Sequence, residues 1–393
     1  MRDAVVGIVI GCVVGIMLGA TVIAPRMNAA RTDHPPKPAG SETLNASPST
    51  GEQTSLLTTH DGGATTHGGM AQSGVTLKLA SAFSLQSPDM GAQITRFTDQ
   101  IQRVSNGAVH VSVQAPNAPI APTDFFDAIS GGALDGAFID PGLWAGRAPA
   151  LNLFSSVPFG PEMNEFSAWY ATGGGREAFA DIAKGLSMHA LACGVAPGMA
   201  AGWFRVPVTS ARSFLHLRIA ARGLGARVLA RAGAKVFDMK PADIFMAMEE
   251  GLLDAAQVPL PTDDSRMEFN PAAQTYYFPG WHKPLTLLAL MIRQQRWDAL
   301  TPARRAQIET VCGDTMRQGL GSGEAVQFAA LKTLTADGIN IRRLPQSAIN
   351  TLKKAWGAVV REEAAKDKTF AALWRSLSDF RENYGIWREL STP

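Results

Sequence analysis

The chain has 393 residues, of which 46% are hydrophobic, and this is enough for two ordinary domains with a sizeable core. Its formal net charge is only +2, and no block of basic residues is interleaved with aromatic ones, which argues against a nucleic-acid partner. The three cysteines have no metal-ligand spacing. We therefore predict no metal site, no cofactor and at most one disulfide in the folded part.

The first predicted element is a transmembrane helix at residues 4–24. This stretch is uncharged and long enough to cross a bilayer at about 1.5 Å per residue. An uncleaved anchor in residues 1–25 is expected, with a cleaved signal peptide or a lipoprotein signal at Cys12 as alternatives. A glycine at every fourth position would allow close pairing with a second helix, as a dimer or with another subunit. These glycines are Gly7, Gly11, Gly15 and Gly19.

A linker and a folded unit follow the predicted anchor. Residues 26–74 are rich in Ser, Thr, Gly and Pro, a composition typical of a disordered linker. In the folded unit, 75–393, Val75–Ser81 and Val109–Val113 have the pattern of strands, and Gly91–Val104 has that of a helix. This alternation predicts a parallel α/β sheet, which binds ligands beyond the carboxyl ends of its strands.

One unit occurs twice in the folded region. Asp124–Phe138 and Asp243–Gln257 align without a gap at an offset of 119 residues. Each copy reads as a helix, a glycine stop, an aspartate in the turn and the start of a strand. The repeat predicts two similar α/β lobes that face each other across a cleft, with a chance match as the alternative.

Several motifs resemble those of the solute receptors of tripartite ATP-independent periplasmic (TRAP) transporters, dicarboxylate-receptor type. The similarity runs from Leu77 to Glu389 and is nearest to the subgroup for 2-oxo and 2-hydroxy monocarboxylates. The motifs are GLWAGRAPA at 142–150, SVPFG at 156–160, AWYATGGG at 168–175, GWFR at 202–205, GLG at 223–225 and YYFPGWHKP at 276–284.

The resemblance implies a two-lobed periplasmic-binding-protein-like fold with hinges near residues 199–205 and 257–262. It implies a binding protein rather than an enzyme. A small organic anion would be the ligand, and the membrane subunits of a TRAP-type permease would be the partners. Together with the anchor, it places the folded unit in the periplasm, tethered to the inner membrane.

The carboxylate-binding arginine of that family corresponds to Ala220 here, and Arg218 and Arg222 flank this position. An arginine binds a carboxylate through two parallel hydrogen bonds. We expect Arg222 to take this role, because it directly precedes the Gly223–Gly225 turn and the amino end of the following helix. Arg218 is the alternative, and a structural role for both arginines stays open.

Other positions of the expected cleft differ from the resembling subgroup. The Glu-Trp pair of its cation site is replaced by Gln257 and Val258, so metal-assisted binding is not carried over. Gln257, Trp144 and Trp203 are the further candidates to line the cleft. Core packing is an equal alternative for Trp144, and the motifs around Trp203 and His282 are interpreted as structural. The ligand has therefore changed, or the scaffold has become a sensory or protein-interaction module.

Three further features are interpreted as not functional. A strand, GLGARV and a helix imitate a dinucleotide-binding fingerprint, but Val228 stands at its third glycine. Asp263-Asp264 is interpreted as a solvated turn, and Glu362-Glu363 as part of a charged outer helix face. Residues 297–389 are predicted to be mainly helical, with one strand at Ile339–Leu344.

Overall fold

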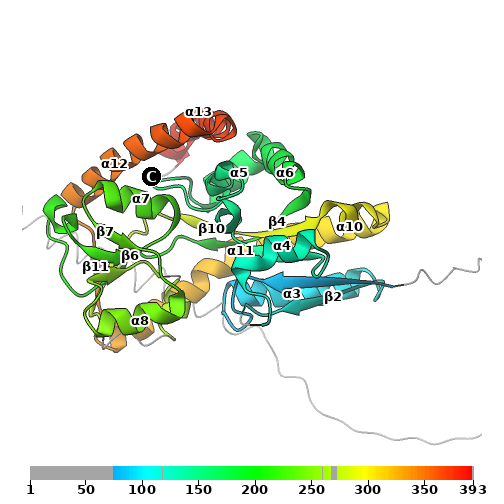
Figure 1. Cartoon of the computed structure of the whole chain (residues 1–393), viewed down its shortest axis with the longest axis horizontal. Coiled ribbons are helices and arrows are strands. Elements are labelled where there is room, and N and C mark those ends of the chain that lie inside the picture. The colour runs from blue at the N-terminus through cyan, green and yellow to red at the C-terminus, as the bar shows by residue number, and fades with distance from the viewer. Residues whose placement is uncertain (1–73, 117, 259, 267–271, 392–393) are drawn as a thin grey trace, which may run out of the picture. The chain divides into compact units, whose positions relative to one another are not determined.

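Figure 1 shows the computed structural model of the chain, which describes residues 74–116, 118–258, 260–266 and 272–391. Within these ranges the strands form two sheets, one of five strands and one of six. Each sheet is the centre of one lobe, so the predicted two-lobed α/β architecture is confirmed.

The five-stranded sheet belongs to the first lobe and has the strand order β2-β1-β3-β10-β4. β1 pairs in parallel with β2 and β3, but β10 is antiparallel to β3 and β4. The parallel pairing predicted for the first strands is confirmed for β1, β2 and β3, and β10 is antiparallel because it arrives directly from the other lobe without a crossover helix. The strands are β1 (Val75–Ser81), β2 (Val109–Gln114), β3 (Gly136–Ile139), β4 (Met188–Pro197) and β10 (Leu285–Arg293).

The six-stranded sheet belongs to the second lobe and has the strand order β11-β9-β5-β8-β6-β7. It is also mixed: β6 is parallel to β7 and β8, whereas β5 is antiparallel to β8 and β9. Its strands are β5 (Gly202–Phe204), β6 (Arg218–Ala220), β7 (Lys235–Phe237), β8 (Ala255–Ala256), β9 (Thr275–Phe278) and β11 (Asn340–Arg343).

Helices cover both sheets, and the region after residue 293 is mainly helical, as predicted. In Figure 1, α7 and α8 lie on opposite faces of the six-stranded sheet, and their buried side chains belong to different core clusters. The α-helices are α3 (Met90–Val104), α4 (Phe125–Ser130), α5 (Met163–Thr172), α6 (Gly175–Gly185), α7 (Gly223–Arg231), α8 (Pro241–Glu249), α9 (Pro261–Asp264), α10 (Gln294–Asp298), α11 (Pro302–Ala336), α12 (Gln346–Lys366) and α13 (Lys368–Ser391). Four short 3-10 helices are η2 (Pro122–Asp124), η3 (Pro141–Trp144), η4 (Pro149–Phe154) and η5 (Ala211–Phe214).

The predicted repeat is confirmed in atomic detail. Gly132 after α4 and Gly251 after α8 have φ angles of +82° and +75°, which glycine adopts without steric cost. Asp135 Oδ2 accepts a hydrogen bond from the Lys78 backbone N–H at 2.8 Å, and Asp254 Oδ2 accepts one from the Arg218 backbone N–H at 2.9 Å. In each lobe the repeated aspartate therefore joins the helix–strand turn to the neighbouring strand.

The chain connects the lobes at several places, among them two short segments and one long helix. Residues 198–201 lead from β4 to β5, and residues 279–284 return from β9 to β10. The first segment overlaps the hinge predicted at 199–205. The second predicted hinge, 257–262, follows β8 and includes the first two residues of α9, and its residue 259 lies outside the described residues. Hinge motion at both segments stays a prediction.

The long helix α11 is linked to the first lobe by a disulfide. Cys312 on α11 and Cys193 on β4 form this bond, and both residues are buried. Leu334 at the other end of α11 belongs to the core of the second lobe, together with Trp203. The pair that sequence analysis allowed in the folded part is thus present in the structure.

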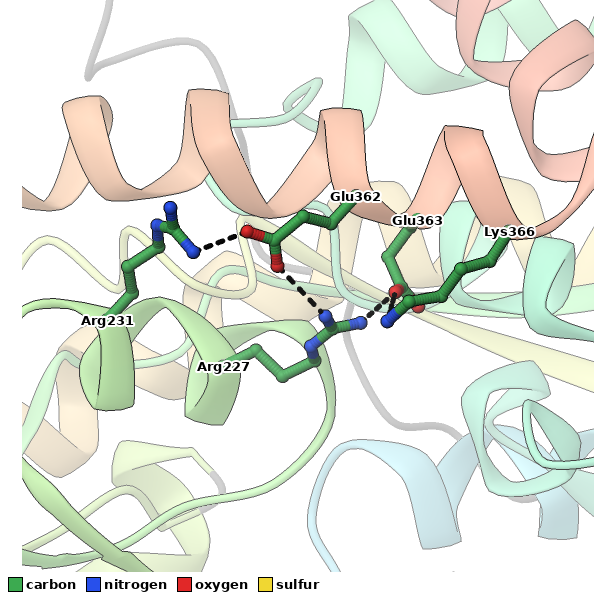
Figure 2. A network of polar contacts seen from close by, with 5 residues as sticks. All are labelled: Arg227, Arg231, Glu362, Glu363 and Lys366. Carbon is green, nitrogen blue, oxygen red and sulfur yellow. Dashed lines mark hydrogen bonds and ion pairs between the residues drawn. The ribbon is translucent and has the colours of Figure 1, made fainter.

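The helices α12 and α13 brace different lobes. Figure 2 shows ion pairs between α12 and α7. Glu362 pairs with Arg227 and Arg231, and Glu363 pairs with Arg227 and with Lys366 of its own helix. α13 instead contacts the first lobe, where Ser376 Oγ donates to the Gly173 carbonyl at 3.2 Å.

The interpretation of Glu362-Glu363 as an outer charged face is therefore wrong. The side chain of Glu363 is only 13% exposed, and its partner Arg227 lies 136 residues earlier in the chain.

No helix among the described residues is long and apolar enough to cross a membrane. The predicted anchor at 4–24, its glycines and residues 26–73 of the linker lie outside the described residues.

Candidate functional site

The carboxyl ends of β6 and β8 meet the amino end of α7 in the second lobe. β6 and β8 are parallel neighbours, and the Gln257 backbone N–H donates to the Ala220 carbonyl at 2.9 Å. α7 begins shortly after β6, at Gly223, with a φ of +62°. The first N–H groups of an α-helix have no partner within the helix, and the helix dipole attracts anions. This edge of the sheet therefore suits a carboxylate.

Gln257 and His282 lie against the first turn of α7. A Cβ added at Gly225 would come within 2.8 Å of His282 Cβ and 3.4 Å of Gln257 Oε1. Both amide atoms of Gln257 are buried and have no hydrogen-bond partner in the described part of the chain. His282 is 5% exposed, and its Nδ1 also lacks a partner there. Because buried polar atoms are normally paired, these side chains mark the candidate site.

His282 and Lys283 reach towards different lobes. Burial, and to a lesser degree the charge of Lys283, lowers the pKa of the His282 imidazole to about 3, so the ring is neutral at physiological pH. Lys283 forms an ion pair with Asp140, which directly follows β3 in the first lobe. Two consecutive residues thus contact α7 in one lobe and the end of β3 in the other.

Arg218, the alternative carboxylate ligand, is held by Asp254. Its Nε lies 3.0 Å from Oδ2 and its Nη2 lies 2.5 Å from Oδ1. These hydrogen bonds from Arg218 lower the pKa of the Asp254 carboxyl. Since Asp254 also fixes the repeated turn, the guanidinium of Arg218 belongs to the scaffold of this lobe.

Arg222, the expected carboxylate ligand, directly precedes α7 and is held by more exposed contacts than Arg218. Its Nε donates to Asp238 at 2.5 Å, and its Nη2 donates to the Met239 carbonyl at 2.8 Å. The side chains of Arg222 and Asp238 are 58% and 74% exposed. Exposed pairs contribute about 0–1 kcal/mol, so this contact is easily exchanged for another. Ligand binding by either arginine stays a prediction.

The two tryptophans proposed for the cleft lie in the cores. Trp144 is 3% exposed and packs edge-on against Phe126, with ring centroids 5.1 Å apart. Trp203 is fully buried and stacks on Tyr276, with centroids 4.4 Å apart. Of the five predicted site residues, the structure places Gln257 against the first turn of α7 and Arg222 directly before it.

Asp263-Asp264 is not a solvated turn, so that interpretation is wrong. The two residues end the short helix α9, and Asp264 is fully buried. Asp264 accepts hydrogen bonds from Trp203 Nε1 and Tyr276 Oη. Burial raises the pKa of the Asp264 carboxyl to about 7 and also raises the pKa of Asp263. The local sequence could not indicate these partners, because they come from β5 and β9.

Sequence analysis assigned no binding role to His282 and did not consider Lys283 or Asp140. A signal for them does exist. Asp140 directly follows the buried strand GAFI, and the HK pair interrupts a mostly apolar stretch that runs from Tyr276 to Ile292. Charged residues at the end of a buried strand usually need a partner.

The residues present do not fit a hard cation. Among the described residues, no group of three His, Cys, Asp or Glu side chains is placed to hold a metal ion. The Gln257 amide is neutral and adds no negative charge to an oxygen ligand set.

Comparison with known proteins identifies the family. The model of bacterial extracellular solute-binding protein, family 7, matches residues 80–367, which is more than half of the chain. The chain belongs to this family. Its members are solute-binding proteins rather than enzymes, so the resemblance to TRAP receptors is confirmed.

Individual relatives support the assignment. The monocarboxylate 2-oxoacid-binding periplasmic protein of Nostoc sp. is 26% identical over 292 residues, covering 74% of this chain and 80% of the relative. A TRAP transporter solute-binding protein from Bordetella bronchiseptica, with calcium and picolinate, has a TM-score of 0.77 at 24% identity. The matched region covers 81% of this chain and 95% of that protein's chain. A solute-binding protein from Pseudoalteromonas atlantica, with sodium and pyruvate, has a TM-score of 0.76 at 24% identity, with 81% and 97% coverage. At this identity, the structural likeness establishes the fold.

Proposed function

We propose that this family 7 protein is the extracytoplasmic solute receptor of a TRAP-type transporter and that it binds a small organic carboxylate at the amino end of α7. The observation that carries the proposal is that the Gln257 amide and His282 Nδ1, at this helix end, have no hydrogen-bond partner among the described residues. The Nostoc relative, named for 2-oxoacids, supports a small carboxylate as the ligand class. Contacts from both lobes would favour a closed state when the solute is bound.

Arg222 is the proposed charged ligand of the carboxylate. It lies at the amino end of α7, and its present pair with Asp238 is exposed on both sides. A bidentate pair with a solute would replace this exposed pair by a charge-assisted bond in a less exposed place, where each such bond is stronger. Arg218 would have to give up its two side-chain hydrogen bonds to Asp254, whose side chain is 22% exposed.

The proposed location is the periplasmic side of the inner membrane. The uncharged stretch 4–24 would tether the receptor, the linker at 26–74 would let it move, and the membrane subunits of the permease would receive the solute. The buried Cys193–Cys312 disulfide supports this location, because such bonds persist in oxidising compartments. Pairing of the anchor through Gly7, Gly11, Gly15 and Gly19 is part of the same proposal.

The test is calorimetric titration of the full chain, purified in detergent and refolded to remove carried-over ligand. The panel holds mono- and dicarboxylates, each with calcium, with sodium and with EDTA. We expect micromolar or tighter binding of at least one carboxylate, and loss of that binding in Arg222→Ala with unchanged unfolding. No binding of any carboxylate by the cooperatively folded protein would refute the receptor proposal and favour a sensory or protein-interaction role for the scaffold.

A further inference from the structure

The amide of Gln257 has no partner for either of its polar atoms. Its Nε2 can donate two hydrogen bonds and its Oε1 can accept two, yet both atoms are buried without a partner among the described residues. A buried amide left in this state is costly, and a bound molecule that completes its hydrogen bonds would remove this cost. The amide therefore indicates which hydrogen-bonding groups the bound solute has.

The protein around Gln257 does not supply the missing donor. Gly225 has no side chain, and the neighbouring His282 ring makes no hydrogen bond to the amide. The guanidinium of Arg218 is bound to Asp254, and the ammonium of Lys283 is bound to Asp140. A solute with both an acceptor for Nε2 and a donor for Oε1 would complete the amide.

This requirement separates two classes of small acid. A 2-oxo acid has only acceptor oxygens at neutral pH, so it can satisfy Nε2 but leaves Oε1 unpaired. A 2-hydroxy acid, or an acid with an amide N–H beside its carboxylate, has an acceptor and a donor side by side. A site that hydrogen-bonds a hydroxyl discriminates strongly against an analogue that lacks it.

We propose that Gln257 determines specificity at this site, by selecting carboxylates that carry a hydroxyl or amide donor over the matching 2-oxo acids, without a metal ion. The inference rests on the proposed carboxylate site. One buried acceptor without a donor corresponds to a roughly 5- to 150-fold weaker affinity, and this is the expected ratio between the members of a matched pair.

The experiment compares matched pairs on the full chain by calorimetry in EDTA. Lactate is titrated against pyruvate, and 2-hydroxybutyrate against 2-oxobutyrate. In wild-type protein the hydroxy acid of each pair should bind at least ~5-fold more tightly. Gln257→Met keeps the length of the side chain and removes both hydrogen-bonding atoms, so the two members of a pair should then bind equally. Gln294→Met, at a partly exposed glutamine of α10 whose amide donates to Asp298, is the control and should keep the wild-type ratio.

The outcomes separate this inference from the proposed function. Equal or tighter binding of the 2-oxo acids by the wild-type protein overturns the inference and leaves the carboxylate receptor intact. A preference that survives in Gln257→Met also overturns it, because another group would then supply the acceptor. Absence of binding to every carboxylate overturns the proposed function as well. Even if Gln257→Met does not fold, a wild-type protein that does not prefer the hydroxy acids overturns the inference.

Discussion

Removing the Cys193–Cys312 disulfide should lower the stability of the folded unit by several kcal/mol. The two cysteines are 119 residues apart in sequence, and both are buried between β4 and α11. For a loop of this length, the chain-entropy model gives a loss of about 16 cal/mol/K, or about 5 kcal/mol at 25 °C. Measured effects are usually smaller than this limit, so we expect Cys193→Ala/Cys312→Ala to cost about 2–5 kcal/mol.

The assay is urea unfolding of the oxidised wild type, both single variants and the double variant. Each single variant already loses the bond, so the double variant should cost much less than the sum of the two singles. The slope of unfolding free energy against urea should rise, since the unbridged denatured chain exposes more surface. A double variant within about 0.5 kcal/mol of the oxidised wild type would show that the covalent link adds no stability, and the reasoning would fail.

Three further predictions concern buried charges and the repeated turn. Burial raises the pKa of the Asp264 carboxyl from 3.8 to about 7. The contribution of this group to the free energy of unfolding is therefore full below pH 4 and is lost as the pH rises through 7. Between pH 5 and 8 the unfolding free energy of the wild type should fall by ~2–3 kcal/mol, whereas that of Asp264→Asn should not show this fall. Parallel pH profiles of the two proteins in urea unfolding would contradict this. Gly132→Ala and Gly251→Ala should each cost about 1–2 kcal/mol in thermal unfolding, because both φ angles are positive. Gly313→Ala, in the exposed interior of α11, is the control and should stabilise the protein by ~0.5–1 kcal/mol. Equal effects at all three positions would refute the turn argument. Lys283→Met should cost roughly 3 kcal/mol in urea unfolding, since it leaves a mostly buried carboxylate unpaired, and a loss below 1 kcal/mol would contradict a structural ion pair.

Local sequence patterns were sufficient for the lobes and for the repeated turn. The glycine positions required by positive φ and the aspartates that follow them depend only on nearby backbone geometry. β1 has the predicted bounds, and α3 begins one residue earlier than predicted, because apolar spacing records which face of each element is buried. Sheet direction was less predictable, since β10 joins the first lobe from a distant part of the chain.

Charged residues were misinterpreted where their partners are distant in sequence. Asp264 and Glu363 both occur in polar stretches that are typical of exposed segments. Asp264 is nevertheless enclosed by side chains of β5 and β9, and Glu363 is bound by Arg227 of α7. A polar local sequence therefore did not predict solvent exposure, because long-range packing decides which carboxylates are buried. The same limit applies to the site, where the distant His282 is placed against α7.

The internal repeat also gives a reason to assign function to Gln257. At the repeat offset of 119 residues, the position equivalent to Gln257 in the first lobe is Phe138. Phe138 lies within β3 and is fully buried, with its ring 5.3 Å from that of Phe97. The shared helix–turn–strand scaffold thus accepts an apolar core residue at this point and does not require an amide. An amide that the scaffold does not need, placed beside the amino end of α7 with both polar atoms unpaired, is better explained by a bound solute than by folding.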